Sequence, residues 1–168
     1  MEGCIKRLMS IYWKIASLIG ISLLLLTDER PIGFITMFIS QLLIFISIWF
    51  WVDLNEEIAD LPQKRALPLT TKVWRWGISL YSMLATSMTL IALPCISNSE
   101  GGYCNAWLEA PENMHDIAQQ LFGFLFGADW NKPLAGFIGY ILLIIYGIGL
   151  LQWILVRLPK QGRVAGDF

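Results

Sequence analysis

Cysteines are the residues of this sequence whose chemistry is easiest to specify, and two of the three lie in one polar stretch. Cys95 and Cys104 are nine positions apart, with glycines and an asparagine between them. Such a segment closes readily into a small loop. The membrane spans predicted below place this stretch on the non-cytoplasmic side, where the compartment is usually oxidising. We therefore expect a structural disulfide between Cys95 and Cys104, and a thiol at Cys4 on the other side.

Acidic side chains form the second group that could do chemistry. Paired carboxylates can bind a metal ion or transfer protons. Here they follow helical spacing, but no histidine and no defined ligand spacing accompanies them. The pattern favours a solvated acidic edge or a docking surface for a basic partner, on a helix that continues from the preceding apolar run. The residues concerned are Asp53, Glu56, Glu57 and Asp60, and we expect the helix to end at Pro62.

Long apolar runs are the elements that must position these groups. The chain has 168 residues, of which 56% are hydrophobic and only 15% charged, more apolar surface than a soluble domain of this size could bury. Four runs each approach the ~20 residues that a membrane-spanning helix needs. The sequence therefore predicts a single-domain, all-α integral membrane protein with four transmembrane helices, at about 8–26, 32–52, 73–93 and 134–156.

The long outer loop, residues 94–133, contains a predicted fifth helix that starts at Pro111. Its apolar positions fall on one side and its polar positions on the other, while its start is too polar to cross a membrane. We expect an interfacial amphipathic helix along the outer membrane surface. His115 lies near its start, and a surface or helix-capping role is favoured over a pigment or metal ligand.

Basic residues predict the orientation of the spans. Nine flank the side that carries both termini and only two, Arg30 and Lys132, flank the other side. The positive-inside rule then places both termini in the cytoplasm. Lys14 is the one charge inside a span, and a side chain that snorkels to the cytoplasmic headgroups is favoured over an intramembrane ion pair. The nine residues are Lys6, Arg7, Lys64, Arg65, Lys72, Arg75, Arg157, Lys160 and Arg163.

Small residues recur on one side of the third and fourth spans. Small side chains let helices approach closely, because lipid provides no hydrophobic drive between spans. These positions favour a seam, that is, a surface at which helices pack closely, over a groove for a ligand. Together they offer more surface for close helix packing than a single four-helix bundle obviously needs, and we call them the seam residues. We therefore predict that a partner binds part of this surface, together with an aromatic side chain of the outer loop. The predicted partner-binding residues are Ser79, Ser82, Thr86, Thr89, Gly136, Gly139, Gly147 and Trp107.

Several segments together resemble a family of small integral membrane proteins of cyanobacteria and plastids, described only as a domain of unknown function. The resemblance implies an oxygenic phototroph and a photosynthetic membrane, and it implies no catalytic residues. Members carry further apolar sequence ahead of the first of these segments, which implies that this chain is a short form or starts late. The segments are YWKIASL (12–18), WFWVDLNEEIADLP (49–62), WRWGISLY (74–81), the cysteine pair followed by WLEAP (107–111), and VRLPKQGR (156–163).

Two functional hypotheses follow. The first is a non-catalytic accessory subunit or assembly factor of a photosystem or related complex in the cyanobacterial thylakoid membrane. Lipid, chlorophyll or carotenoid could be bound through that complex, and the charge pattern gives no reason to expect nucleic acid. The second is a membrane thiol/quinone oxidoreductase that resembles the bacterial disulfide-forming quinone reductases. Those enzymes need Cys-x-x-Cys in the first outer loop, which here reads TDERP. A transporter is disfavoured because no span is broken.

Overall fold

The computed structural model describes residues 2–60, 66–97 and 102–165, and all regular elements within these ranges are helices. Four of them are long and apolar enough to cross a membrane, which confirms the predicted fold class. Pro62, Lys64 and Arg65, which entered the predicted helix end and the basic-residue count, lie outside the described ranges. The elements are α1 (Glu2–Thr27), α2 (Ile32–Phe50), α3 (Val52–Ala59), α4 (Ala66–Ala92), the 3₁₀ helix η1 (Leu93–Ile96), α5 (Gly102–Phe126), α6 (Lys132–Gln152), the π-helix η2 (Trp153–Arg157) and α7 (Leu158–Gln161).

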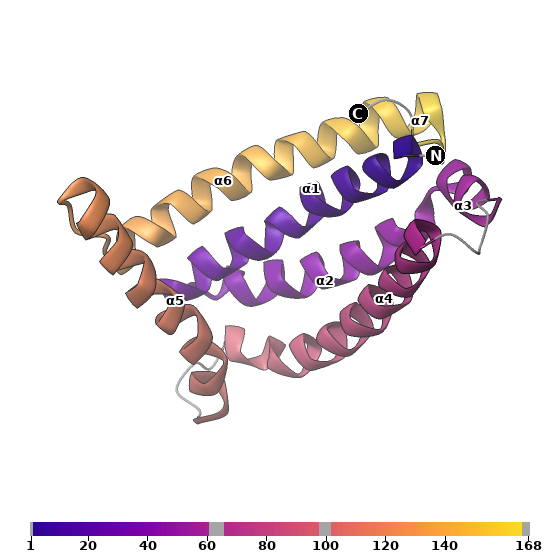
Figure 1. Ribbon diagram of the computed structural model, residues 1–168. Helices are drawn as coiled ribbons and strands as arrows, with labels where there is room; N and C mark the ends of the chain where they lie inside the picture. The colour runs from indigo at the N-terminus through magenta and orange to yellow at the C-terminus, as the bar shows by residue number, and fades with distance from the viewer. Residues whose placement is uncertain (1, 61–65, 98–101, 166–168) are drawn as a thin grey trace.

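The four long helices lie side by side in the order α6, α1, α2, α4 (Figure 1). The extensive contacts are those between α6 and α1, between α1 and α2, and between α2 and α4. The arrangement is therefore a row with α4 and α6 at its edges, and α3 and α7 lie together at one end of it (Figure 1). As a result, α4 and α6 each keep a broad apolar face that no other described helix covers.

The turn between α1 and α2 is tight, as TDERP predicts. The Arg30 amide donates to the carbonyl of Leu25 at 3.0 Å, a closure in which Glu29 takes the left-handed conformation with a φ of 54°. Pro31 occupies the N-cap position of α2, where its missing N–H costs nothing. Asp28 accepts a hydrogen bond from Arg30, which raises the pKa of that guanidinium above its ordinary value.

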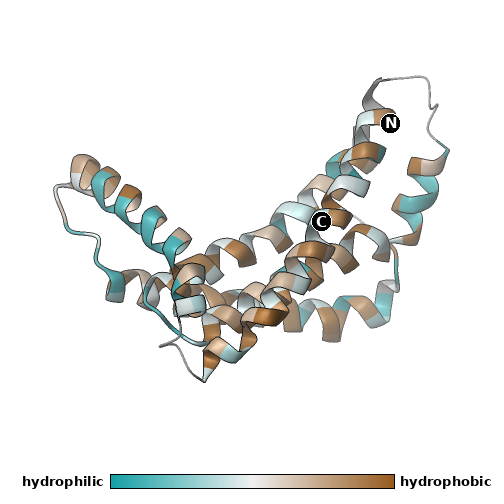
Figure 2. Cartoon of the chain, turned by 90° about the horizontal axis from the view of Figure 1, so that it is seen from below, coloured by the Kyte–Doolittle hydropathy of each residue, from teal (hydrophilic) through white to brown (hydrophobic). Residues whose placement is uncertain are grey.

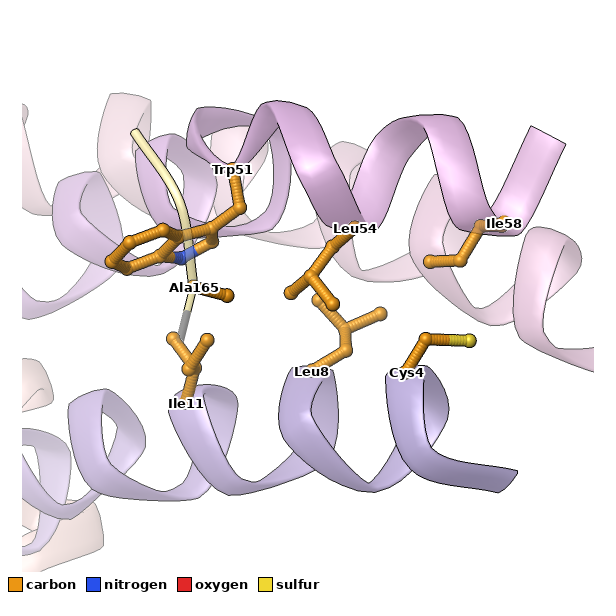
Figure 3. Close-up of a cluster of buried hydrophobic side chains, with 7 residues drawn as sticks. All are labelled: Cys4, Leu8, Ile11, Trp51, Leu54, Ile58 and Ala165. Atoms are coloured by element: carbon orange, nitrogen blue, oxygen red, sulfur yellow. The ribbon is translucent and has the colours of Figure 1, made fainter. Parts of the chain in front are cut away.

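The prediction that the second span continues as one helix to Pro62 is wrong. Trp51 adopts an extended conformation, with φ −86° and ψ 112°, so α2 ends at Phe50 and the short helix α3 begins at Val52. α3 folds against the first turns of α1 (Figure 3). Hydrophobic burial holds it there, in a cluster formed by Cys4, Leu8, Ile11, Trp51, Leu54, Ile58 and Ala165.

Helix α5 lies across the opposite end of the row (Figure 1). One side of it is polar, in contrast to the largely apolar long helices (Figure 2, left). It begins at Gly102 and contains Pro111 in its interior, so the predicted start at Pro111 is wrong. His115 is buried rather than at the surface, because it lies on the side of α5 that also buries Cys104, Leu108 and Pro111. The Thr27 hydroxyl donates to the Pro111 carbonyl at 3.4 Å and links this side to the end of α1.

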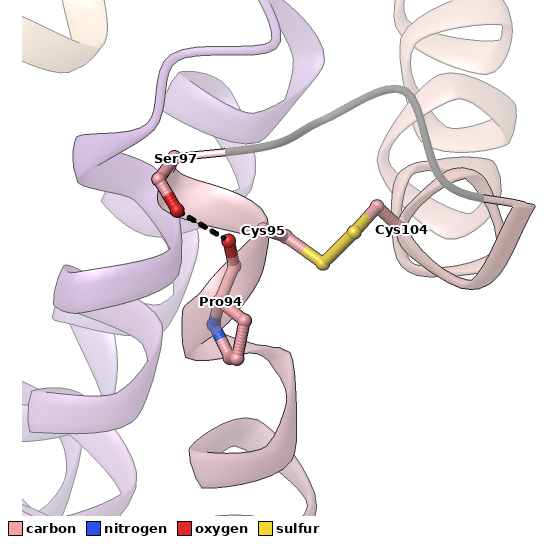
Figure 4. Close-up of a disulfide and its surroundings, with 4 residues drawn as sticks. All are labelled: Pro94, Cys95, Ser97 and Cys104. Carbon is pink, nitrogen blue, oxygen red and sulfur yellow. Dashed lines mark hydrogen bonds between the residues drawn. A yellow bond between two sulfur atoms is a disulfide. The ribbon is translucent and has the colours of Figure 1, made fainter.

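A disulfide joins Cys95 in η1 to Cys104 in α5 (Figure 4). Both sulfur-bearing side chains are buried in an apolar cluster with Leu26, Phe34 and Leu108. The bond therefore ties the end of α4 to helix α5, which crosses this end of the row. The segment between the cysteines includes residues 98–101, which lie outside the described ranges.

Candidate functional site

Several hydrogen bonds from distant parts of the chain meet at the break between α2 and α3. Where α2 ends, the carbonyl groups of its last turn lose their helical N–H partners. Three side chains replace those partners. Arg75 donates to Ile48 at 2.9 Å, Asn55 donates to Trp49 at 3.0 Å, and Arg163 donates to Phe50 at 2.8 Å.

Arg75 is the central residue of this arrangement. It extends from α4, is buried, and also donates to the amide oxygen of Asn55. Its guanidinium lies 4.4 Å from the ring centroid of Trp49, whose indole N–H in turn donates to Ser79 at 2.8 Å. The sequence analysis counts Arg75 among the basic residues that flank the spans, and its contacts in the structure fasten α4 to the break after α2.

The C-terminal segment forms hydrogen bonds with the first residues of α3, just after the break. The amide of Val52 donates to the carbonyl of Arg163 at 3.1 Å, and the amide of Ala165 donates to the Asp53 carboxylate at 3.0 Å. Arg7 on α1 contacts both Glu57, at 2.7 Å, and Asp53, at 3.5 Å. Two carboxylates of the predicted acidic edge, those of Asp53 and Glu57, are therefore engaged within the chain, and Glu56, Glu57 and Asp60 are exposed.

A groove of about 730 Å³ lies next to this break, between α1, α2 and the end of α6. Phe50, the last residue of α2, and Trp51, between α2 and α3, meet Trp153 from η2 there, with the two indole centroids 5.6 Å apart. Most of the groove wall is aliphatic or aromatic. Its polar lining consists of Lys14, Ser17, Ser47, Tyr146, Gln152 and Arg157.

The shape of the groove depends on η2, the π-helical segment Trp153–Arg157. A π-helix widens the turn by one residue, and such segments are frequent at functional sites. None of its five residues is buried. Trp153, Ile154, Val156 and Arg157 line the groove directly.

Most of the predicted seam residues on α4 are buried against other parts of the same chain. Ser79, Ser82 and Thr89 are buried, whereas Thr86 is half-buried. The hydroxyls of Ser79 and Thr89 donate to carbonyl groups one turn earlier, those of Arg75 and Ala85. A partner could reach the buried members only if α4 moved away from the row.

The predicted glycines divide in the same way. A Cβ atom at Gly136 would lie 2.3 Å from the Asp28 carboxylate, and one at Gly139 would lie 3.1 Å from Leu25, so both glycines allow α6 to approach α1. Gly147 is exposed and has nothing within 4 Å of the same position. Trp107 is half-buried against the cluster around the disulfide. Partner binding through the predicted residues of α4 and α6 and through Trp107 stays a prediction.

Sequence reasoning missed the groove and the capped break. The basic and aromatic residues that form them are visible in the sequence. Such residues are equally typical of anchors at a membrane interface, so the sequence does not distinguish the two roles. Within the described residues, no group of three or more His, Cys, Asp or Glu side chains could hold a metal ion. The groove also lies far from the disulfide, roughly 18 Å along α1 between Lys14 and Leu26 at a rise of ~1.5 Å per residue.

In the comparison with known proteins, the sequence model of the family described as "Protein of unknown function (DUF3177)" matches residues 1–166. No curated protein and no solved structure matches the chain.

Proposed function

The chain belongs to the family described as "Protein of unknown function (DUF3177)", and from the arrangement of its helices we propose that it is a non-catalytic accessory subunit or assembly factor of a larger membrane protein complex. The observation that carries this proposal is the open row of helices, in which α4 and α6 form uncovered edges. A partner helix can extend such a row without displacing any contact within it.

The composition of the two edges differs and favours α4 as the side that meets the partner. α6 exposes mainly aliphatic side chains, such as Ile144, Ile145 and Ile148, which suit lipid chains. α4 exposes Trp76 and Tyr81, together with Met83 and Met88. Aromatic and methionine side chains are enriched at protein interfaces, where aromatic residues often dominate the binding energy.

We place the complex in a photosynthetic membrane, as a photosystem or related assembly in a cyanobacterial thylakoid. The support for this is the sequence resemblance described above. Four of its five segments, 12–18, 49–62, 74–81 and 156–163, contribute residues to the break, the groove or their immediate surroundings. The fifth, the cysteine pair followed by 107–111, lies at the disulfide on the other end of the row.

The alternative, a thiol/quinone oxidoreductase, receives no support from the geometry. Cys95 and Cys104 are buried in an apolar cluster, and the groove that could hold a quinone lies toward the other end of the row. Thiol–disulfide exchange requires that an attacking thiolate reach one of the two sulfurs. The covered disulfide fits a structural bond better than a redox centre.

Co-migration tests the proposal. The tagged protein is solubilised in a mild detergent and separated on a native gel, and we expect it to migrate with a complex much larger than itself. Tyr81→Ala removes an exposed aromatic ring from α4 and should release the protein, since truncation at an interface anchor commonly costs 2 kcal/mol or more, roughly thirtyfold in affinity.

Phe137→Ala provides the matched control, because Phe137 is an equally exposed aromatic residue on α6. We expect this variant to migrate like the parent. A parent protein that migrates alone would refute the companion function. Release by Phe137→Ala but not by Tyr81→Ala would instead place the partner on α6.

A further inference from the structure

We propose that a second pocket, between α3 and the first turns of α4, binds one oxyanion of the phosphate class at the level of the lipid headgroups. The anion lies beside the buried guanidinium of Arg75. The site is independent of the proposed function and shares no lining residue with the groove described above. Two observations carry it, the donors that line the pocket and a buried positive charge that no carboxylate of the described chain contacts.

The lining of this pocket is rich in N–H donors and has no acidic side chain among its described residues. The pocket has a volume of about 430 Å³, at the end of the row where α3 lies next to the start of α4 (Figure 1). Such a lining is complementary to a ligand that carries several acceptor oxygens. The lining residues are Trp49, Asn55, Ile58, Ala59, Lys72, Arg75 and Trp76.

The positive charge of Arg75 is buried among neutral partners. The residue is 5% exposed, and both of its hydrogen bonds leave from Nη2, toward the Ile48 carbonyl and the Asn55 amide oxygen. Its buried Nε has no acceptor within the part of the chain that the structure describes. The remaining contact is the ring of Trp49. A buried charge is costly unless it is paired, so an anion in the pocket supplies the negative charge that these partners lack.

The acidic residues of α3 do not neutralise the pocket. Asp53 and Glu57 contact Arg7 on α1, on the other side of the short helix. Among the residues described, no ion pair joins Lys72 or Arg75 to a carboxylate. Two positive charges therefore line the pocket, and neither is bound to an acid of residues 2–60, 66–97 or 102–165.

Two tryptophans indicate the depth of the pocket and the shape of its ligand. The rings of Trp49 and Trp76 meet edge to face, with their centroids 5.3 Å apart, and tryptophan favours the headgroup level of a bilayer. Donors reach the pocket from α4, through Lys72 and Arg75, and from α3, through Asn55. Tetrahedral oxygens suit donors that come from two helices, and phosphate groups occur at this depth both on lipids and in the adjoining water.

Calorimetric titration of the full-length protein tests the proposal. The protein is kept in an uncharged maltoside detergent and a phosphate-free buffer, and the probes are inorganic phosphate, dihexanoyl phosphatidic acid and dihexanoylglycerol. We expect the phosphate-bearing probes to bind one to one, whereas dihexanoylglycerol, with the same chains and no phosphate, should not bind. Tighter binding of phosphatidic acid than of inorganic phosphate identifies a lipid headgroup as the ligand, and the reverse order identifies a soluble anion.

Variants with matched controls place the anion in the pocket. Lys72→Gln should weaken binding of the phosphate-bearing probes roughly tenfold, since it removes a charged donor, whereas Lys72→Arg should retain binding. Trp76→Phe keeps the ring, removes the indole N–H and should weaken binding roughly threefold. The controls are Lys160→Gln and Trp13→Phe, which make the same changes at exposed positions outside the lining and should leave binding unchanged.

A steric variant tests the pocket without changing any charge. Ala59 is exposed and lines the pocket, so Ala59→Leu should fill part of it and abolish binding. Ala110→Leu, at an exposed position on α5, is its control and should bind like the parent. Arg75 itself is left intact because it also caps the end of α2. Circular dichroism confirms that each variant keeps its helices.

Three outcomes would overturn the proposal. The first is that neither phosphate-bearing probe binds, and the second is that dihexanoylglycerol binds as tightly as phosphatidic acid. The third is that Lys72→Gln and Lys160→Gln lower the affinity equally, which would show a general attraction to basic residues in place of a site.

Discussion

Arg75 on α4 donates a hydrogen bond to the carbonyl oxygen of Ile48 on α2, with 2.9 Å between Nη2 and O. In a continuous helix this carbonyl would accept from the amide of Val52, but that amide donates to Arg163 instead. An unsatisfied carbonyl at the edge of the hydrocarbon is costly, because no water replaces the lost partner. The contact between two spans therefore makes the break after Phe50 possible and positions α3 against α1.

Replacing Arg75 by methionine should destabilise the fold by about 2–3 kcal/mol, since a buried acceptor then loses a charged donor. The measurement is the midpoint of unfolding in a denaturing-detergent titration, followed by circular dichroism. Lys72→Met, one turn away on the same helix and half-buried, is the control and should shift the midpoint little. Equal midpoints for the two variants would show that the break does not depend on Arg75.

Gly136→Ala should weaken the contact between α6 and α1 by about 1–3 kcal/mol, because the new methyl group would overlap the Asp28 side chain. The same change at Gly147 should be neutral or stabilising, since the position is open and alanine favours the helix over glycine by up to ~1 kcal/mol. The same unfolding titration compares the two variants. A Gly147→Ala variant that is less stable than Gly136→Ala would contradict the packing described here.

The disulfide between Cys95 and Cys104 should contribute on the order of 2–3 kcal/mol to stability, as expected for a short closed loop. Mass spectrometry of the unreduced protein should detect this pair as bonded and Cys4 as a thiol that is alkylated after denaturation. The double variant Cys95→Ala, Cys104→Ala should insert and remain helical while unfolding earlier. Two alkylatable thiols at these positions in the native protein would exclude the bond.

Both termini should lie on the cytoplasmic side, because the number of spanning helices is even and basic residues concentrate at that end. A periplasmic-type phosphatase fused after Phe168 should be inactive, whereas the same enzyme inserted after Asp129 in the outer loop should be active. A fluorescent reporter that folds only in the cytoplasm provides the reciprocal control at both sites. An active phosphatase at the C-terminus would invert the predicted orientation.

The sequence by itself determined the number and approximate position of the spans, the tight first turn and the cysteines that could pair. Hydrocarbon imposes this directly, because an uncharged run of about 20 residues must satisfy its backbone as a helix. Small residues likewise indicated where helices approach, as at Gly136 and Gly139. Features of this kind can be predicted from the sequence, because their physical cause lies in the residues of the segment itself.

Only the tertiary structure decided where α2 ends and which helices adjoin. Nothing in residues 49–54 forbids a continuous helix, since the segment has neither proline nor glycine. The break exists because Arg75 and Arg163, 27 and 113 positions away from their acceptors, supply the missing hydrogen bonds. The groove has the same origin, for its walls come from three helices. Helix propensity is a property of neighbouring residues, whereas capping from a distance is available only once α4 and the C-terminal segment have packed against α2.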